Sequence, residues 1–191
     1  MSKFRVRALC QMAILIAIFV LLDVTLVIKT GNWELTFASL PVVVGSLMFG
    51  PLTGVLVAVI GEFMSQMLSF GLTLTTAIWI LPPMGWALVI GTAAARLKKT
   101  GSPLENRPVL CYAVCIFGGV VTSGLNTLAL WLDSLIYHYY AFAFVFGSAL
   151  LRLPKDIMVA LIVATVAIPL VRLLKKSMTV GGSARKARGM E

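Results

Sequence analysis

The chain has 191 residues, of which 60% are apolar and 12% charged, and its net charge is +9. A soluble domain of this size needs a largely polar outside, so the composition excludes one. The apolar residues fall in long blocks, which are typical of membrane spans, and the length fits one domain. We therefore expect an all-α integral membrane protein.

The positive charge does not indicate a nucleic-acid-binding protein. The basic residues sit at the ends of apolar blocks, whereas a nucleic-acid surface would interleave them with stacking aromatics. The cysteines Cys10, Cys111 and Cys115 lie inside apolar segments without metal-like partners. We expect them to pack as small apolar residues.

The first apolar run begins at Ala8, after the basic residues 1–7, and reaches Ile28. It is too long for a typical signal core and no small-residue cleavage pattern follows, so we interpret it as the first span. We predict a single domain over residues 1–176, a compact bundle of six membrane helices at about 8–28, 36–50, 51–69, 77–97, 109–132 and 154–174.

The second and third spans are separated only by Gly50-Pro51. Glycine permits a sharp bend and proline suits the first turn of a helix, so this pair predicts a tight helical hairpin. The second span is short, and we expect it to be tilted or shielded by protein.

Six spans place both termini, the hairpin and the 98–108 loop on one side of the membrane. That side carries thirteen lysines and arginines, against three on the other. Because basic residues mark the cytoplasmic side, both termini are predicted to be cytoplasmic. The thirteen are Lys3, Arg5, Arg7, Arg96, Lys98, Lys99, Arg107, Arg172, Lys175, Lys176, Arg185, Lys186 and Arg188, and the three are Lys29, Arg152 and Lys155.

Two segments lie outside the six predicted spans. Residues 133–153 are too apolar and aromatic for a solvated loop. We expect them either to fold back over the bundle or to extend the sixth helix outward, with a bend at Pro154. The basic tail, residues 177–191, is predicted to be flexible and to lie against anionic lipid.

The sequence shows no sign of catalysis. The single histidine, His138, lies in the external aromatic segment, and no nucleophile triad, metal-ligand set or cofactor motif is present. No GxxxxGK[ST] motif occurs either, so any ATP is hydrolysed by another protein.

Six polar residues fall in the outer half of the predicted bundle, and they come from four helices. Charged groups at this depth are costly unless a cavity or a partner needs them. Their shared depth predicts a ligand cavity, although they could instead pair with one another, Glu62 with Lys155 for instance, and only hold helices together. The six are Asp23, Glu62, Asn126, Arg152, Lys155 and Asp156.

The segment 69–76 joins the third and fourth spans without a charge. Gly71 permits a tight turn, and the segment offers hydroxyls and exposed backbone to the same cavity. Trp79 follows one turn into the fourth span, either as an interfacial anchor or as a stacking wall for a planar ligand. Pro82-Pro83 must disturb that helix. The candidate ligand contacts in this region are Phe70, Thr73, Thr75, Thr76 and Trp79.

Ala13 and Ala17 lie one turn apart on the first predicted helix. Small residues at this spacing allow another helix to approach closely, either within the protein or from a partner.

Together these features resemble the substrate-binding S components of energy-coupling factor (ECF) transporters. The resemblance covers nearly the whole chain and includes the Ala13-x-x-x-Ala17 pair. It is greatest to the folate branch, because of Leu40-Pro41, the stretch Leu47–Gly54, Leu125-Asn126-Thr127-Leu128 with Tyr137, and Arg152-Leu153-Pro154-Lys155. Glu62 stands where that branch often has Asp, and residues 76–83 differ from its fourth helix.

The resemblance implies a subunit of a prokaryotic cell membrane that captures a vitamin for an ATP-driven importer. Its partners would be a transmembrane coupling subunit, which contacts Ala13 and Ala17, and two cytoplasmic ATPases. Folate suits the polar set, since pterin N–H groups match Glu62 or Asn126, and Arg152 and Lys155 match the glutamate carboxylates. Pantothenate, or a cationic or neutral vitamin, remains an alternative, and a membrane sensor or enzyme is the alternative of another class.

Overall fold

The computed structural model describes residues 3–30 and 33–188, with side chains described at residue 6, 8–27 and 36–177. The helices and strands of these residues are α1 (Lys3–Thr25), β1 (Ile28–Thr30), β2 (Trp33–Leu35), α2 (Ser39–Phe49), α3 (Pro51–Phe70), α4 (Thr76–Trp79), α5 (Leu81–Lys99), the 3-10 turn η1 (Leu104–Asn106), α6 (Pro108–Ile136) and α7 (Phe142–Arg188).

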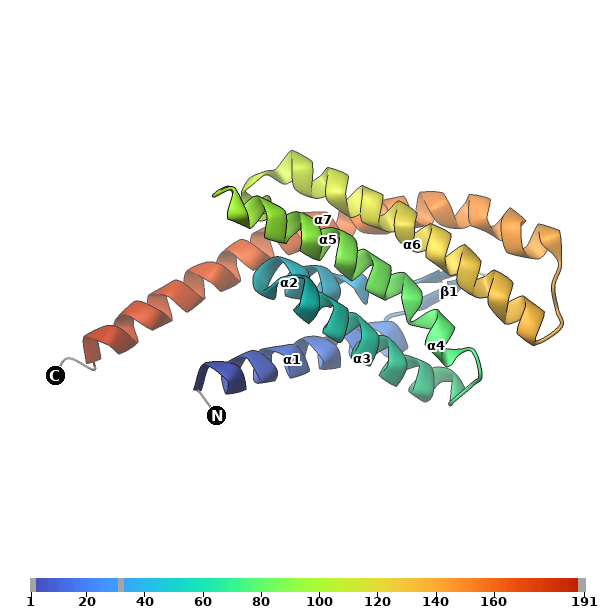
Figure 1. Ribbon diagram of the computed structural model, residues 1–191, viewed down its shortest axis with the longest axis horizontal. Helices are drawn as coiled ribbons and strands as arrows, with labels where there is room; N and C mark the ends of the chain where they lie inside the picture. The colour runs from blue at the N-terminus through green and yellow to red at the C-terminus, as the bar shows by residue number, and fades with distance from the viewer. Residues whose placement is uncertain (1–2, 31–32, 189–191) are drawn as a thin grey trace.

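The helices form one bundle, and both chain ends lie at the same end of it (Figure 1). In the described residues five helical segments are long and apolar enough to cross a membrane: α1, α3, α4 with α5, α6 and α7. The prediction of an all-α membrane protein is thereby confirmed. The excess of basic residues at the end with the termini identifies that end as cytoplasmic.

The second predicted span corresponds to α2, which has only 11 residues. At this length it spans about 16 Å, half of the ~30 Å hydrocarbon core. Its residues from Pro41 to Leu47 are all buried, so other helices shield it from lipid, as its short length led us to expect.

Glycines set the close packing around the α2–α3 hairpin. Gly50 has a φ of 97°, a conformation that glycine adopts readily, and Pro51 starts α3. A β-carbon on Gly91 of α5 would lie only 2.4 Å from Cα of Pro51. The start of α3 and the middle of α5 are therefore in direct backbone contact.

One connection between spans was not predicted, and one span is interrupted where the sequence predicted a disturbance. The chain between α1 and α2 contains a short antiparallel hairpin, with Ile28 opposite Leu35, which the sequence analysis did not predict. The fourth span is interrupted at Ile80, between α4 and α5. Pro82 and Pro83 lie in the first turn of α5, where they need no donor N–H, so the predicted disturbance appears as a helix start.

The segment 133–153 extends the helices and does not fold back. Helix α6 continues to Ile136, and α7 already begins at Phe142, so Pro154 lies inside α7. The predicted outward extension of the sixth helix is thus observed, whereas the bend at Pro154 stays a prediction. At its other end α7 continues to Arg188, past the predicted boundary at residue 176. Residues 189–191 of the predicted tail lie outside the described residues, and the tail's flexibility stays a prediction.

The cytoplasmic half of the bundle has a solid core. Its completely buried residues include Val43, Ile90, Leu104 and Val171. Cys111 and Cys115 are also completely buried, so both pack as apolar residues, as predicted. Close packing of this kind leaves no room for a ligand.

One buried acid lies at the cytoplasmic end of this core. The carboxylate of Glu105, in η1, forms an ion pair with Lys175 of α7. Nε of Arg172 donates to the Glu105 carbonyl at 2.9 Å, and Nζ of Lys175 donates to the carbonyl of Leu47 at 3.3 Å. These bonds connect the 98–108 loop, α7 and the end of α2.

A candidate ligand cavity in the outer half of the bundle

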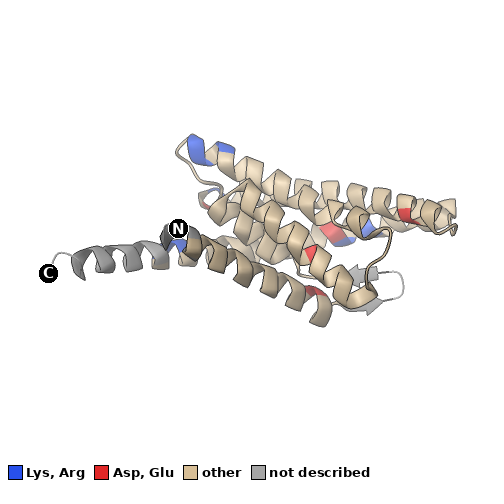
Figure 2. Ribbon diagram, turned by 60° about the horizontal axis from the view of Figure 1, so that its bottom comes forward, with Lys and Arg blue, Asp and Glu red and all other residues tan. Residues whose placement is uncertain are grey.

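The opposite half of the bundle contains a cavity of about 640 Å³. Cavities of roughly 300–1,000 Å³ hold small organic ligands. Most acidic residues of the helices lie in this half, away from the chain ends (Figure 2). The polar residues that line the cavity are Asp23, Thr36, Ser39, Glu62, Ser65, Gln66, Ser69, Thr73, Thr75, Trp79, Trp86, Thr122, Asn126, Asp133, Tyr137, Arg152, Lys155 and Asp156.

One wall of the cavity is built by α1 and α3. Ser65 donates a short hydrogen bond to the carboxylate of Asp23, which links the two helices. One turn earlier on α3, Glu62 accepts a hydrogen bond of 2.9 Å from Nε2 of Gln66. This wall therefore presents carboxylates and hydroxyls, which are hydrogen-bond acceptors.

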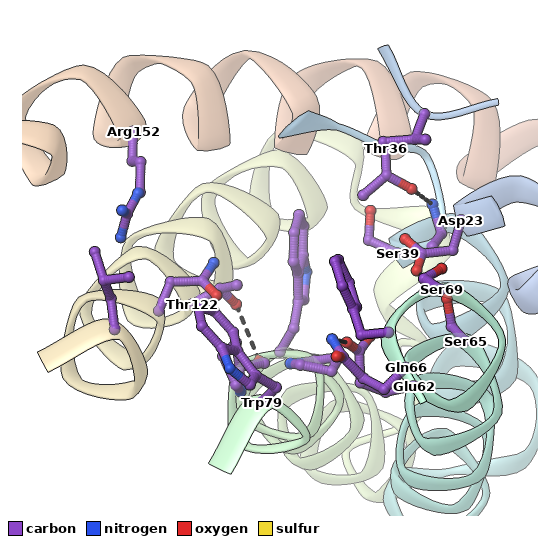
Figure 3. Close-up of a pocket in the computed structure, with 18 of the residues that line it drawn as sticks. Asp23, Thr36, Ser39, Glu62, Ser65, Gln66, Ser69, Trp79, Thr122 and Arg152 are labelled. Carbon is purple, nitrogen blue, oxygen red and sulfur yellow. Dashed lines mark hydrogen bonds between the residues drawn. The ribbon is translucent and has the colours of Figure 1, made fainter. Parts of the chain in front are cut away.

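Arg152 lies across the cavity from Asp23, Ser39 and Ser65 (Figure 3). Its guanidinium donates to Oγ of Ser148 at 2.9 Å, and one turn further along α7 Lys155 pairs with Asp156 at 3.2 Å. Among the described residues that line the cavity, the cations Arg152 and Lys155 both lie on the α7 wall, so the cavity is chemically two-sided.

The outer rim of the cavity is held by Asp133, near the end of α6. Its carboxylate is buried and accepts hydrogen bonds from Nε1 of Trp79, at 3.3 Å, and from the Tyr139 hydroxyl. Tyr139 also packs edge to face on Phe144. Burial, and then the bond to Asp133, raise the pKa of Tyr139, so its hydroxyl stays protonated and donates at physiological pH.

The threonine-rich segment before α4 forms a small hydrogen-bonded turn. The hydroxyl of Thr76 accepts from the Thr73 N–H at 3.0 Å and lies 2.9 Å from the Thr73 hydroxyl. Thr73 and Thr75 line the cavity, whereas Thr76 is not among its lining residues. Thr76 thus shapes the turn, and its predicted ligand contact is not supported by this geometry.

Nine residues were predicted as ligand contacts: Glu62, Asn126, Arg152 and Lys155 of the polar set, and Phe70, Thr73, Thr75, Thr76 and Trp79. All of them except Thr76 line the one cavity. Whether each binds a ligand stays a prediction. The predicted contacts did not include Ser39, Ser65, Trp86 and Thr122, which also line the cavity and whose types are common in membrane helices. Only helical spacing from Glu62 and Trp79 could have indicated Ser65 and Trp86.

The predicted partner contacts lie on a different surface. Ala13 and Ala17 are exposed on α1, while Phe19 of the same helix is buried against the bundle. Among the described residues the pair is not packed inside the bundle, and its contact with a partner helix stays a prediction. In the described residues no group of His, Cys, Asp and Glu could hold a metal ion.

The fold is similar to that of solved S components. The S component for biotin from an ECF-type ABC transporter aligns over 90% of this chain and 95% of its own, with a TM-score of 0.60 and 18% identity. A bacterial ECF-transporter S component aligns over 92% and 96%, with 0.52 and 16%. FolT bound with folic acid aligns over 83% and 92%, with 0.58 and 15%. At these identities the likeness shows the fold: a multi-pass membrane bundle.

The sequence model of one family, described as the ECF-type riboflavin transporter S component, matches residues 3–176. The chain therefore belongs to the S components of ECF transporters, the membrane subunits that bind a vitamin for uptake. A search of curated proteins found no match.

Proposed function

We propose that this chain captures folate or a closely related pterin from the outer side of the membrane. The observation that carries the proposal is the two-sided cavity. Its acceptor-rich wall, with Asp23 and Glu62, suits the amino and ring N–H groups of a pterin. Arg152 and Lys155 on the opposite wall suit the glutamate carboxylates, and Trp79 offers a flat apolar surface to the ring.

Riboflavin is the second candidate. The family whose model matches this chain is named after riboflavin, which is a planar vitamin without ionised groups. It would use the acceptors and the aromatic walls and leave Arg152 without an anionic partner. The two candidates therefore differ in how strongly they depend on this arginine.

A thermal-shift series on the purified protein in detergent separates these candidates. Folate, riboflavin, biotin and pantothenate would each be added at the same concentration. A ligand present at 100 times its Kd stabilises the folded state by about 2.7 kcal/mol. We expect folate to raise the melting temperature most. A shift with riboflavin alone would contradict the folate assignment and leave vitamin capture intact.

We further propose that Ala13 and Ala17 contact the transmembrane coupling subunit, which joins two cytoplasmic ATPases. Their exposure on α1 supports this role, because small side chains let a partner helix approach closely. Replacing both with leucine should leave vitamin binding by the isolated protein unchanged and abolish most transport by the assembled complex. Ala113→Leu, at an exposed alanine on α6, is the control and should transport normally. Normal transport by the double variant would exclude this contact.

A further inference from the structure

Trp79 lines the outer cavity, yet its own chain segment holds it only weakly (Figure 3). It is the last residue of α4, a helix of four residues, and the helical path is interrupted at the next residue, Ile80. A single helical turn is not stable without tertiary contacts. The side chain of Trp79 is only half-buried. The orientation of its indole ring therefore depends on a contact with another helix.

That contact is with Asp133 of α6. Nε1 of Trp79 donates to Oδ1 of Asp133 at 3.3 Å, and the two residues lie 54 positions apart in the sequence. Oδ2 of the same carboxylate accepts from the Tyr139 hydroxyl. Hydrogen bonds to an ionised acceptor are stronger than those between neutral groups. Each oxygen of this buried carboxylate thus has a donor from the protein itself.

The way in which α6 ends brings Tyr139 back to Asp133. The Tyr137 N–H donates to the Asp133 carbonyl at 3.0 Å. The Tyr139 N–H donates to the Ser134 carbonyl at 3.1 Å, and His138 between them has a φ of 57°. This is the Schellman pattern of helix ends, in which the left-handed position is usually glycine. It reverses the chain, so the Tyr139 side chain reaches a carboxylate six residues earlier.

We propose that Asp133 is a positioning residue for ligand binding, which holds the indole of Trp79 as a flat wall for the planar ring of the vitamin. This inference rests on the proposed function and adds the group that orients the wall. Asp133 acts through Trp79, because both of its carboxylate oxygens already accept from the protein. The role is the same for the pterin of folate and for the ring system of riboflavin, since either ring can stack on an indole.

Exchange of the Trp79 indole N–H with water tests this bond without any ligand. The chain has four tryptophans, and in protein carrying ¹⁵N-labelled tryptophan the Trp79 signal is the one lost in Trp79→Phe. Asp133→Ala leaves room for water beside the indole and should speed the exchange. Asp133→Asn is the matched control, because its amide oxygen can accept from Trp79 and its amide N–H can donate to the Tyr139 hydroxyl. Equal exchange in the parent and in Asp133→Ala would overturn the positioning role.

A double-mutant cycle then tests whether the effect on affinity passes through Trp79. Folate affinity and melting temperature would be measured on the same samples of the parent, Asp133→Ala, Trp79→Phe and the double variant. Losing the geometry of one aromatic contact should weaken binding about three- to tenfold. We expect this loss for Asp133→Ala in the parent, but a change of less than about twofold where Trp79 is already phenylalanine. Asp133→Asn should bind folate about as tightly as the parent.

Two results of the cycle would overturn the positioning role and leave folate capture standing. If Asp133 touched the ligand directly, the loss caused by Asp133→Ala would persist in the Trp79→Phe background. If Asp133 were merely structural, Asp133→Ala would lower the melting temperature and leave the affinity of the folded protein unchanged. If the parent binds riboflavin and not folate, the folate assignment fails, and the same cycle with riboflavin tests the positioning role. A parent that binds neither vitamin would contradict both proposals.

Discussion

The two halves of this bundle are built from the same helices but differ in how their polar groups are satisfied. In the cytoplasmic half, the buried carboxylate of Glu105 is paired with Lys175, and its carbonyl accepts from Arg172. In the outer half, Nε1 of Trp86 and Oδ2 of Asp156 are buried without a hydrogen-bond partner in the described part of the chain, and a cavity of about 640 Å³ lies beside these residues. One half is complete by itself, whereas the other has capacity for a ligand.

This difference predicts that substitutions separate into two classes. Changes in the closely packed half should lower stability and leave the intrinsic affinity of folded protein unchanged. Changes at the cavity should lower affinity at nearly constant stability, because binding groups there are not all needed for folding. The predictions below test this separation, beginning with the largest effect.

Gly91→Ala should cause the largest loss of stability. The added β-carbon would lie 2.4 Å from Cα of Pro51, and neither backbone can move away cheaply. We expect a cost of about 3 kcal/mol, the upper range for overpacking a core, measured as a lower melting temperature. Gly124→Ala is the matched control on α6, since nothing lies within 4 Å of its added β-carbon. That control should be neutral or slightly stabilising. Equal melting temperatures for the two variants would contradict the close contact between α3 and α5.

Arg152→Met should cause the next largest effect, on affinity. A hydrogen bond from a charged group contributes roughly 1.5–3 kcal/mol, so folate binding should weaken by about one to two factors of ten. Arg152 is only partly buried and bonds to Ser148 of its own helix, so the melting temperature of the ligand-free protein should change little. Titration of folate and of riboflavin into the parent and the variant measures the effect.

The riboflavin titration is the internal control, because a ligand without ionised groups should lose little when Arg152 is replaced. A parallel loss for both vitamins would indicate that the arginine shapes the cavity and does not meet a carboxylate.

The architecture could be predicted from the sequence because the apolar blocks, and the basic residues at their ends, form patterns that extend over many residues. The Gly50-Pro51 pair fixed the hairpin, and Pro82-Pro83 correctly indicated a disturbed fourth span. The sequence did not predict where α7 begins, since an apolar segment such as 142–153 suits both a helix and a packed loop. The hairpin of β1 and β2 has strands of three residues, which are too short to produce a pattern.

The cavity could be predicted only in part. Ionisable residues such as Glu62 and Arg152 were found because charge at membrane depth needs a reason. Trp86 was missed because a tryptophan in an apolar helix equally indicates packing, although it lines the cavity.

The smallest predicted effect concerns the rim, where Tyr139 donates to Asp133. Tyr139→Phe removes this donor, but the residue is 41% exposed, so water can replace it and the loss should stay below about 1 kcal/mol at neutral pH. Because the pKa of Tyr139 in the folded state is raised above its ordinary value of 10.0, this contribution is complete below pH 10 and is lost as the pH rises further. Melting temperatures of the parent and the variant, measured from pH 7 to 11, should therefore converge at the alkaline end. A difference that stays constant over this range would show that Tyr139 acts by packing on Phe144 and not through its hydroxyl.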